Sequence, residues 1–238
     1  MTTLFLQKPR PIPTIFTVIA VIVCSACGIW QLQRMAWKHD KMQLIEERIG
    51  LPEVPLPATM ANPEEWEYRH VAVTGTFLHD KESYTPAQST RGNYGFQVIT
   101  PLERPDGSLV LVNRGWVPDP QRDPAARAEG QVQGQTTVSG VVRLPWHQKW
   151  IARQVMPPPD LKQMIFFDGD LAAMAKAHGI TAFPVFVEAD ETLNPGGWPK
   201  GGQTVIKLSD PHLSYAIQWF AFAITAAVIF VLYHRRKG

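Results

Sequence analysis

Two long stretches without Asp, Glu, Lys or Arg lie near opposite ends of the chain, and they constrain its fold more than any other feature. The first runs from residue 11 to 33 and the second from 211 to 233, so each holds 23 residues. At about 1.5 Å per helical residue, each would extend roughly 34 Å, enough to cross a bilayer core of about 30 Å. The sequence therefore predicts two transmembrane helices and argues against an ordinary cytosolic protein.

The net charge of +2 conceals an uneven distribution of charge. Residues 34–210 hold all 21 acidic side chains and 18 of the 23 basic ones, a net charge of −3. The other five basic residues lie at the ends, at positions 8, 10, 235, 236 and 237. No segment is strongly basic, so we expect no nucleic-acid partner.

The basic residues at the ends also predict the orientation in the membrane. Lys and Arg next to a membrane span stay preferentially in the cytoplasm, and Arg235, Arg236 and Lys237 directly follow the second stretch. Three cations after the first stretch, Arg34, Lys38 and Lys41, oppose this orientation, but loops as long as 34–210 translocate largely regardless of charge. We expect both termini to be cytoplasmic.

The predicted organisation has five parts. They are a cytoplasmic N-terminus (1–10), transmembrane helix 1 (11–33), an exported domain (34–210), transmembrane helix 2 (211–233) and a cytoplasmic C-terminus (234–238). About ten residues precede the first span, too few for a mitochondrial presequence, so the expected location is a bacterial inner membrane with a periplasmic main domain.

The two cysteines, Cys24 and Cys27, both lie in the first span. A lipoprotein-type cleavage before Cys27 is one alternative to a retained span, and a copper or redox pair is an alternative role for the two thiols. At mid-membrane, where water does not bring metal or reductant, we favour small residues at a helix–helix contact.

The segment between the spans is expected to be rich in β-strands. Residues 37–49 keep the helical spacing of apolar side chains until Gly50, and residues 51–63 form a proline-rich linker. Alternating β-branched and aromatic residues then predict strands at 69–77, 95–102, 108–113, 136–144 and 183–189. An Asp-Gly pair at 106–107 predicts a hairpin turn. We expect one small antiparallel barrel or sandwich with one or two helices.

One short helix is expected at residues 168–178, with Asp168 or Asp170 as N-cap and Gly179 just after its end. The sequence carries no nucleophile elbow, phosphate loop or paired metal-binding histidines, so we expect a protein that is not an enzyme.

The unusual chemistry lies where each span meets the expected exported domain. Helical spacing puts three side chains on one face of the first helix and three on one face of the second: Trp30, Arg34 and Trp37, and His212, Tyr215 and Trp219. Facing each other, they would enclose an aromatic slot with one imidazole and one guanidinium, the groups that suit a tetrapyrrole. The alternative is an ordinary aromatic belt that anchors the helices among membrane lipids.

Four motifs in the same order carry a resemblance to a known family. They are Gly28-x-Trp30-Gln31-Leu32-x-Arg34-x-x-Trp37-Lys38, Gly95 to Leu102, Val112-Asn113-Arg114-Gly115-Trp116-Val117-Pro118, and His212-Leu213-x-Tyr215-Ala216-x-x-Trp219-Phe220. In these motifs, and in having two spans, the chain resembles the Surfeit locus protein one family of cytochrome c oxidase assembly factors. The Asn-Asn that often precedes the histidine is Asp210-Pro211 here.

The resemblance implies a membrane factor that binds heme a and assists its insertion into oxidase subunit I. It implies His212 as an axial ligand of the heme iron, with Tyr215 and Trp219 as its motif partners, and heme a synthase as a further possible partner. The alternative is a scaffold without cofactor that binds subunit I.

In the third motif, Gly115 predicts a bulge that turns Arg114 and Trp116 out of the sheet. For Arg114 we favour a structural pairing with an acid over contact with heme propionates or the client.

Overall fold

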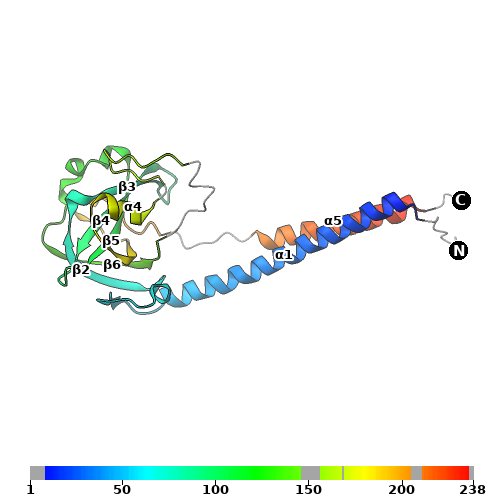
Figure 1. The fold of residues 1–238 in the computed structure, drawn as a ribbon, viewed down its shortest axis with the longest axis horizontal. Helices are drawn as coiled ribbons and strands as arrows, with labels where there is room; N and C mark the ends of the chain where they lie inside the picture. Colours follow the sequence, from blue (N-terminus) through cyan, green and yellow to red (C-terminus); the bar gives the residue numbers. More distant parts are fainter. Residues whose placement is uncertain (1–8, 146–155, 168, 205–210, 236–238) are drawn as a thin grey trace. The chain divides into compact units, whose positions relative to one another are not determined.

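The computed structural model describes residues 9–145, 156–167, 169–204 and 211–235. The chain divides into two compact units. One comprises the residues up to 44 and from 207 on, and we call it the helical unit. The other comprises residues 45–206, and we call it the barrel unit. Figure 1 labels several elements of both.

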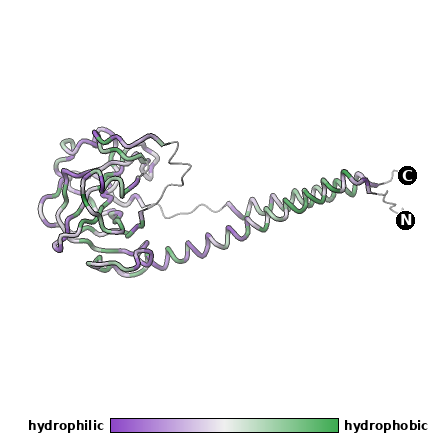
Figure 2. The backbone as a smooth tube through the Cα atoms, in the orientation of Figure 1, coloured by the Kyte–Doolittle hydropathy of each residue, from purple (hydrophilic) through white to green (hydrophobic). Residues whose placement is uncertain are grey.

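Two long helices make up the described part of the helical unit. Helix α1 (Pro11–Ile49) starts at a proline, a residue that suits the first turn of a helix, and ends before Gly50. Its last residues belong to the barrel unit. Helix α5 (His212–Tyr233) follows Pro211. Both are long and apolar enough to cross a membrane, which is compatible with membrane anchoring. Figure 2 shows how apolar residues gather along both. The predicted continuation of the first helix to residue 49 is confirmed.

The barrel unit contains a closed ring of five strands. They are β2 (His70–Phe77), β4 (Tyr94–Glu103), β5 (Leu109–Val117), β6 (Gln135–Arg143) and β7 (Ala182–Ala189). The order around the ring is β2-β6-β7-β5-β4, and β4 pairs again with β2. This closure decides between the two predicted architectures in favour of a barrel. All five predicted strands are present, and the Asp-Gly turn joins β4 to β5.

The sheet is mixed, so the prediction of an antiparallel barrel is wrong at one place in the ring. Strand β7 is antiparallel to β6 but parallel to β5, while the other ring pairs are antiparallel. The reason is one of parity, because strand directions that alternate around a ring cannot close on an odd number of strands. A five-stranded ring must contain at least one parallel pair, and here β5–β7 supplies it.

Two short strands outside the ring were not predicted. Strand β1 (Val54–Pro55) lies within the expected linker and runs parallel to β2. Strand β3 (Ser83–Gln88) pairs with β4 at the end of the sheet order. Its Pro86 has no N–H to donate, which a strand at a sheet edge tolerates. Because these segments contain proline or polar residues, the sequence pattern did not predict either of them as a strand.

Helices and 3-10 turns fill the connections. They are α2 (Pro63–Trp66), η1 (His79–Lys81), η2 (Asp119–Gln121), η3 (Pro124–Gly130), α4 (Leu171–Ala177) and η4 (Pro195–Gly197). Helix α4 confirms the predicted short helix, with the Asp170 side chain accepting a hydrogen bond from the Ala173 N–H and Gly179 just beyond the end. The other proposed cap, Asp168, lies outside the described residues.

Strand β5 is buried on both faces. Val110 and Val112 point to the barrel core, which they share with residues such as Val71 and Leu102. The intervening Leu111 points outward and packs in a second cluster with Met174 of α4. Because successive side chains of a strand face opposite sides, this strand needs apolar residues at every position, as its Leu-Val-Leu-Val run supplies.

Ring closure depends on a close backbone approach at Gly75. Here β2 still pairs with β6 and begins to pair with β4, so that Thr76 lies opposite both Gln135 and Glu103. A Cβ added to Gly75 would overlap the carbonyl oxygen of Glu103 and lie 2.9 Å from Cγ of Leu102. A larger residue therefore opposes the contact that closes the barrel.

We expect Gly75→Ala to destabilise the barrel by about 1–3 kcal/mol, because a backbone oxygen cannot move aside as a side chain does. Chemical unfolding of the full chain in detergent, followed by tryptophan fluorescence, measures this change. Gly134→Ala is the control, since its added methyl group meets nothing within 4 Å and only backbone strain of about 1 kcal/mol applies. Equal losses in the two variants would contradict the role given to Gly75.

Candidate functional site

The two terminal helices pack as an antiparallel pair. At one end the Arg10 N–H donates to Nε2 of His234 at 3.2 Å, and towards the other end Gly28 meets the ring of Phe220. A Cβ added to Gly28 would lie 2.7 Å from that ring. Ala216 and Ala223 of α5 are buried at 1% and 8% exposure. Small residues thus let the helices approach closely.

His212 is held against α1 at the first residue of α5. Its Nδ1 lies 2.6 Å from Oε1 of Gln31, a hydrogen bond between residues 181 positions apart in the sequence. An amide oxygen only accepts, so Nδ1 carries the proton of this bond. The predicted ligand therefore has a defined orientation, set by a residue of the first helix.

The structure does not form the enclosed aromatic slot that we expected between the helices. Trp30, Trp37 and Tyr215 are 57%, 47% and 47% exposed, and the guanidinium carbon of Arg34 lies 4.0 Å from the centre of the Trp37 ring. Trp219 is partly buried and meets Phe222 edge to face at 6.0 Å.

The slot does not form because a different face of α1 meets α5. Gly28 and Gln31 contact α5, and Trp30, Arg34 and Trp37 lie on a different face of the same helix. Among the six predicted site residues, only His212 takes part in the described helix–helix contacts as expected. Cys24 and Cys27 are partly buried free thiols, and their role at a helix contact stays a prediction.

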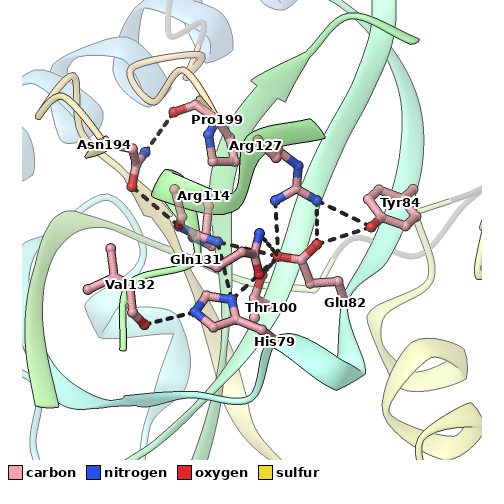
Figure 3. A network of polar contacts seen from close by, with 12 residues as sticks. His79, Glu82, Tyr84, Thr100, Arg114, Arg127, Gln131, Val132, Asn194 and Pro199 are labelled. Atoms are coloured by element: carbon pink, nitrogen blue, oxygen red, sulfur yellow. Dashed lines mark hydrogen bonds and ion pairs between the residues drawn. The ribbon is translucent and has the colours of Figure 1, made fainter. Parts of the chain in front are cut away.

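The barrel unit holds a second candidate site, a buried cluster of charges around Glu82 (Figure 3). The Glu82 carboxylate accepts hydrogen bonds from Nη1 of Arg127 at 3.2 Å and Nη1 of Arg114 at 3.3 Å. Nη2 of Arg127 also donates to it, as do the hydroxyls of Tyr84 at 3.0 Å and Thr100 at 3.3 Å. The side chains of Glu82, Arg114 and Arg127 are all at most 2% exposed. One buried carboxylate is therefore shared by two guanidinium groups.

A β-bulge brings Arg114 into this cluster. Val98 pairs with Gly115 and Ile99 with Asn113, which leaves Arg114 as the extra residue of β5. Gly115 has a φ of +118°, and an added Cβ would overlap the Lys200 carbonyl. The predicted bulge and the predicted pairing of Arg114 with an acid are confirmed. With Arg114 only 1% exposed, its surface is not open to a heme propionate or a client protein.

Burial and hydrogen bonding shift the pKa values in opposite directions. Burial alone would raise the pKa of Glu82, but hydrogen bonds from His79 and Arg127 and the charges of Arg127 and Arg114 lower it to about 2. Burial lowers the pKa of Arg114 to about 10, against the opposing effect of Glu82. Burial also raises the pKa of Tyr84, so its hydroxyl stays a donor. Glu82 and Arg114 are therefore both ionised across the physiological range.

A cavity of about 570 Å³ lies beside the bulge. Trp116 and Trp198 line it, with ring centres 6.0 Å apart, and the Lys200 ammonium lies 4.5 Å from the centre of the Trp198 ring. Tyr94 and Leu193, also in its lining, are 82% and 86% exposed. Large aromatic side chains of this kind are enriched at protein-binding surfaces.

Sequence reasoning missed several residues of these sites, among them Gln31, Glu82 and Arg127. Gln31 lies inside one of the quoted motifs, and an amide side chain in an uncharged span is a signal for a hydrogen-bond partner in the other span. Glu82 and Arg127 lie in polar connecting segments, where nothing in the pattern distinguishes a buried charge from a solvated one.

Comparison with known proteins identifies relatives over most of the chain. The sequence model described as the SURF1 family matches residues 18–224. A SURF1-like protein of Monosiga brevicollis is 35% identical over 229 residues, covering 91% of this chain and 85% of its own length. Surfeit locus protein 1 of Rattus norvegicus is 35% identical over 88% of this chain and 72% of its own length, and that of Homo sapiens 33% over 87% and 73%.

Glu82→Gln tests the buried charge cluster. Two buried guanidiniums then lose their shared carboxylate, so we expect a loss of about 3–5 kcal/mol in the free energy of unfolding at pH 7. Glu103→Gln, an exposed acid at the end of β4, is the control and should change stability by about 0.5 kcal/mol or less. An equally small change for Glu82→Gln would contradict the proposed importance of the cluster.

The same group predicts how stability depends on pH. The folded-state pKa of Glu82 is about 2, below its ordinary value of 4.5. The ionised Glu82 carboxylate therefore contributes about 3 kcal/mol to the free energy of unfolding. This contribution is present in full above pH 4.5 and is lost as the pH falls towards 2. Unfolding curves at pH 7 and pH 3 should show a smaller difference between wild type and Glu82→Gln at pH 3. A constant difference would contradict the shifted pKa.

Proposed function

Since this chain belongs to the SURF1 family, we propose that it is a membrane-anchored assembly factor for cytochrome c oxidase that binds heme a and assists its insertion into subunit I. The observation that carries the heme part of this proposal is the hydrogen bond from Nδ1 of His212 to Gln31. Metal-binding histidines commonly donate from one ring nitrogen to a protein acceptor and bind metal through the other.

Side chains of the two helices suit heme a as cargo. An imidazole provides an iron ligand, Arg34 provides a cation for a propionate, and Trp30, Trp37 and Tyr215 expose aromatic surface for the macrocycle. Because the aromatic faces are exposed, the heme would bind on the side of the helix pair and in contact with lipid or client. An accessible cargo suits transfer to another protein.

We propose that α1 and α5 span the bacterial inner membrane with both termini in the cytoplasm and the barrel unit in the periplasm. The length and composition of the two helices support this, as do the basic residues at both ends of the chain. Heme a synthase is then a natural source of the cargo in the same membrane. We propose no catalytic activity for the chain itself.

A second candidate function is a scaffold that binds subunit I without a cofactor. The cavity beside Trp116 and Trp198 favours it, because Tyr94 and Leu193 expose large apolar surface at 82% and 86%. Exposed apolar residues next to a cavity are a common feature of protein-binding sites. The two functions are compatible, since one uses the helical unit and the other the barrel unit.

His212→Ala tests heme binding. We expect the full chain purified from cells that make heme a to carry heme in the wild type and to lose most of it in the variant, because the iron loses its ligand. Absorption spectra and heme extraction measure the content. His39→Ala, which alters an exposed histidine of α1, is the control. Unchanged heme content in His212→Ala would overturn the ligand assignment.

The double variant Tyr94→Asp with Leu193→Asp tests the scaffold function. We expect at least a tenfold loss of subunit I recovered with the purified chain, because two charges replace the exposed apolar surface, and we expect unchanged heme content. Glu191→Gln, a change within the same cavity lining that preserves both apolar residues, is the control. Full recovery of subunit I with the double variant would exclude this surface as the binding site.

A further inference from the structure

Helix α1 continues to Ile49, well beyond the end of the predicted span at residue 33. The residues just after the span therefore leave the hydrocarbon core on a helix and pass the level of the lipid headgroups. Three of them, Arg34, Lys38 and Lys41, are cationic, and Asp40 is the only acid among residues 34–41. Cations on the exported flank oppose the usual preference for the cytoplasmic side, so their presence in this orientation needs a physical reason.

Two of these cations share one face of α1 with two tryptophans. Trp30, Arg34, Trp37 and Lys41 follow one another at intervals of four, three and four residues, the spacing that aligns side chains along a helix. We call this row the cationic stripe. Trp30 and Trp37 are 57% and 47% exposed, Arg34 is exposed and Lys41 is partly exposed. The helix–helix contacts described above use another face of α1. The cationic stripe is therefore accessible along its length.

Both cations of the stripe gather around the indole of Trp37. The guanidinium carbon of Arg34 lies 4.0 Å from the centre of this ring, and the ammonium nitrogen of Lys41 lies 5.7 Å from it. An aromatic ring attracts a cation through its quadrupole but carries no charge, so these contacts orient the cations without neutralising them. Neither cation forms an ion pair with a residue that the structure describes. Two positive charges thus lie around one indole without an anion.

We propose that the cationic stripe binds the headgroup of an anionic phospholipid in the outer leaflet of the membrane. The phosphodiester accepts hydrogen bonds from Arg34 and Lys41 beside the Trp37 indole, since guanidinium and ammonium groups both bind phosphate oxygens. This inference rests on the proposed insertion of α1 in a membrane, and it gives a reason for positive charge on the exported flank. A heme propionate is an anion too, so the lipid would hold Arg34 while no cargo is bound.

A membrane lipid suits the stripe better than a soluble anion does. Trp30 lies one turn before Arg34, inside the uncharged stretch, and more than half of its surface is exposed. An acyl chain can cover this indole, whereas a free phosphate cannot. Exposed cations also bind small soluble anions weakly, because water and salt screen the charges. The stripe runs from an apolar segment to a charged one, as a phospholipid does from its chains to its headgroup.

The test uses the full chain in nanodiscs of phosphatidylcholine that contain a minor share of phosphatidylglycerol with brominated acyl chains. Bromine quenches the fluorescence of nearby indoles, and the quenching that disappears in Trp30→Phe belongs to Trp30. The same measurement with brominated phosphatidylcholine gives the reference value for a lipid without net charge. We expect the wild type to prefer phosphatidylglycerol by about 5–25-fold, because each Lys or Arg near the membrane surface contributes a factor of about five.

Two double variants separate the stripe from the net charge of the protein. Arg34→Gln with Lys41→Gln should lower the preference to about 1–2-fold, because neutral amides replace both cations. Arg91→Gln with Lys162→Gln is the matched control, since it removes the same charge from two exposed positions of the barrel unit, and it should behave as the wild type does. Equal losses in the two variants would overturn the inference. Arg34→Lys with Lys41→Arg keeps both charges and should retain most of the preference.

The outcomes also separate this inference from the proposed function. Nanodiscs carry the same lipids in both leaflets, so the result does not depend on which terminus is cytoplasmic. A chain that enters nanodiscs without preferring phosphatidylglycerol overturns the inference and leaves the proposed function intact, whereas a chain that does not enter them overturns the membrane anchoring itself. Excess sodium phosphate should leave the quenching of Trp30 as it is in sodium chloride of equal ionic strength. A loss of quenching in phosphate alone would identify a free anion as the occupant and overturn the choice of a lipid.

Discussion

Because a glycine at position 28 has no side chain to hold the Phe220 ring away from the backbone of α1, the two terminal helices come close together. The features of the helical unit that bear on function follow from this contact. It brings Gln31 within 2.6 Å of His212 and determines which face of α1 is turned towards α5. The exposed positions of Trp30 and Trp37 have the same origin. A side chain at position 28 would separate the helices and break the hydrogen bond between Gln31 and the proposed ligand His212.

The barrel unit meets a different constraint, the closure of a ring with an odd number of strands. The parallel pair β5–β7 and the close approach at Gly75 both serve this closure. The bulge at Arg114 then places a cation inside, where the Glu82 carboxylate must neutralise it. A buried carboxylate with two guanidiniums stabilises one arrangement of the connections around it, because leaving any of these charges unpaired is expensive. The loop walls of the cavity beside Trp116 depend on that fixed arrangement.

The sequence predicts local structure well and contacts between distant segments poorly. Both long helices, the five ring strands, the Asp-Gly turn and α4 follow from composition, periodicity and capping residues. The prediction of a slot lined by Trp30 and His212 failed because helical spacing says which residues share a face and does not say which face meets the partner helix. That choice is made by Gly28, whose role depends on Phe220, 192 positions later. The parallel strand pair likewise depends on ring size, which no single segment encodes.

A factor that delivers heme has to hold its cargo firmly enough to prevent loss and loosely enough to release it to the client. The geometry around His212 bears on both demands. A rigid helix pair lowers the entropic cost of binding, because the imidazole is already oriented before the cargo arrives. The exposed aromatic faces limit the strength of the hold, since the described helices form no enclosing wall around them. Orientation without enclosure is what distinguishes a site for transfer from a site for permanent storage.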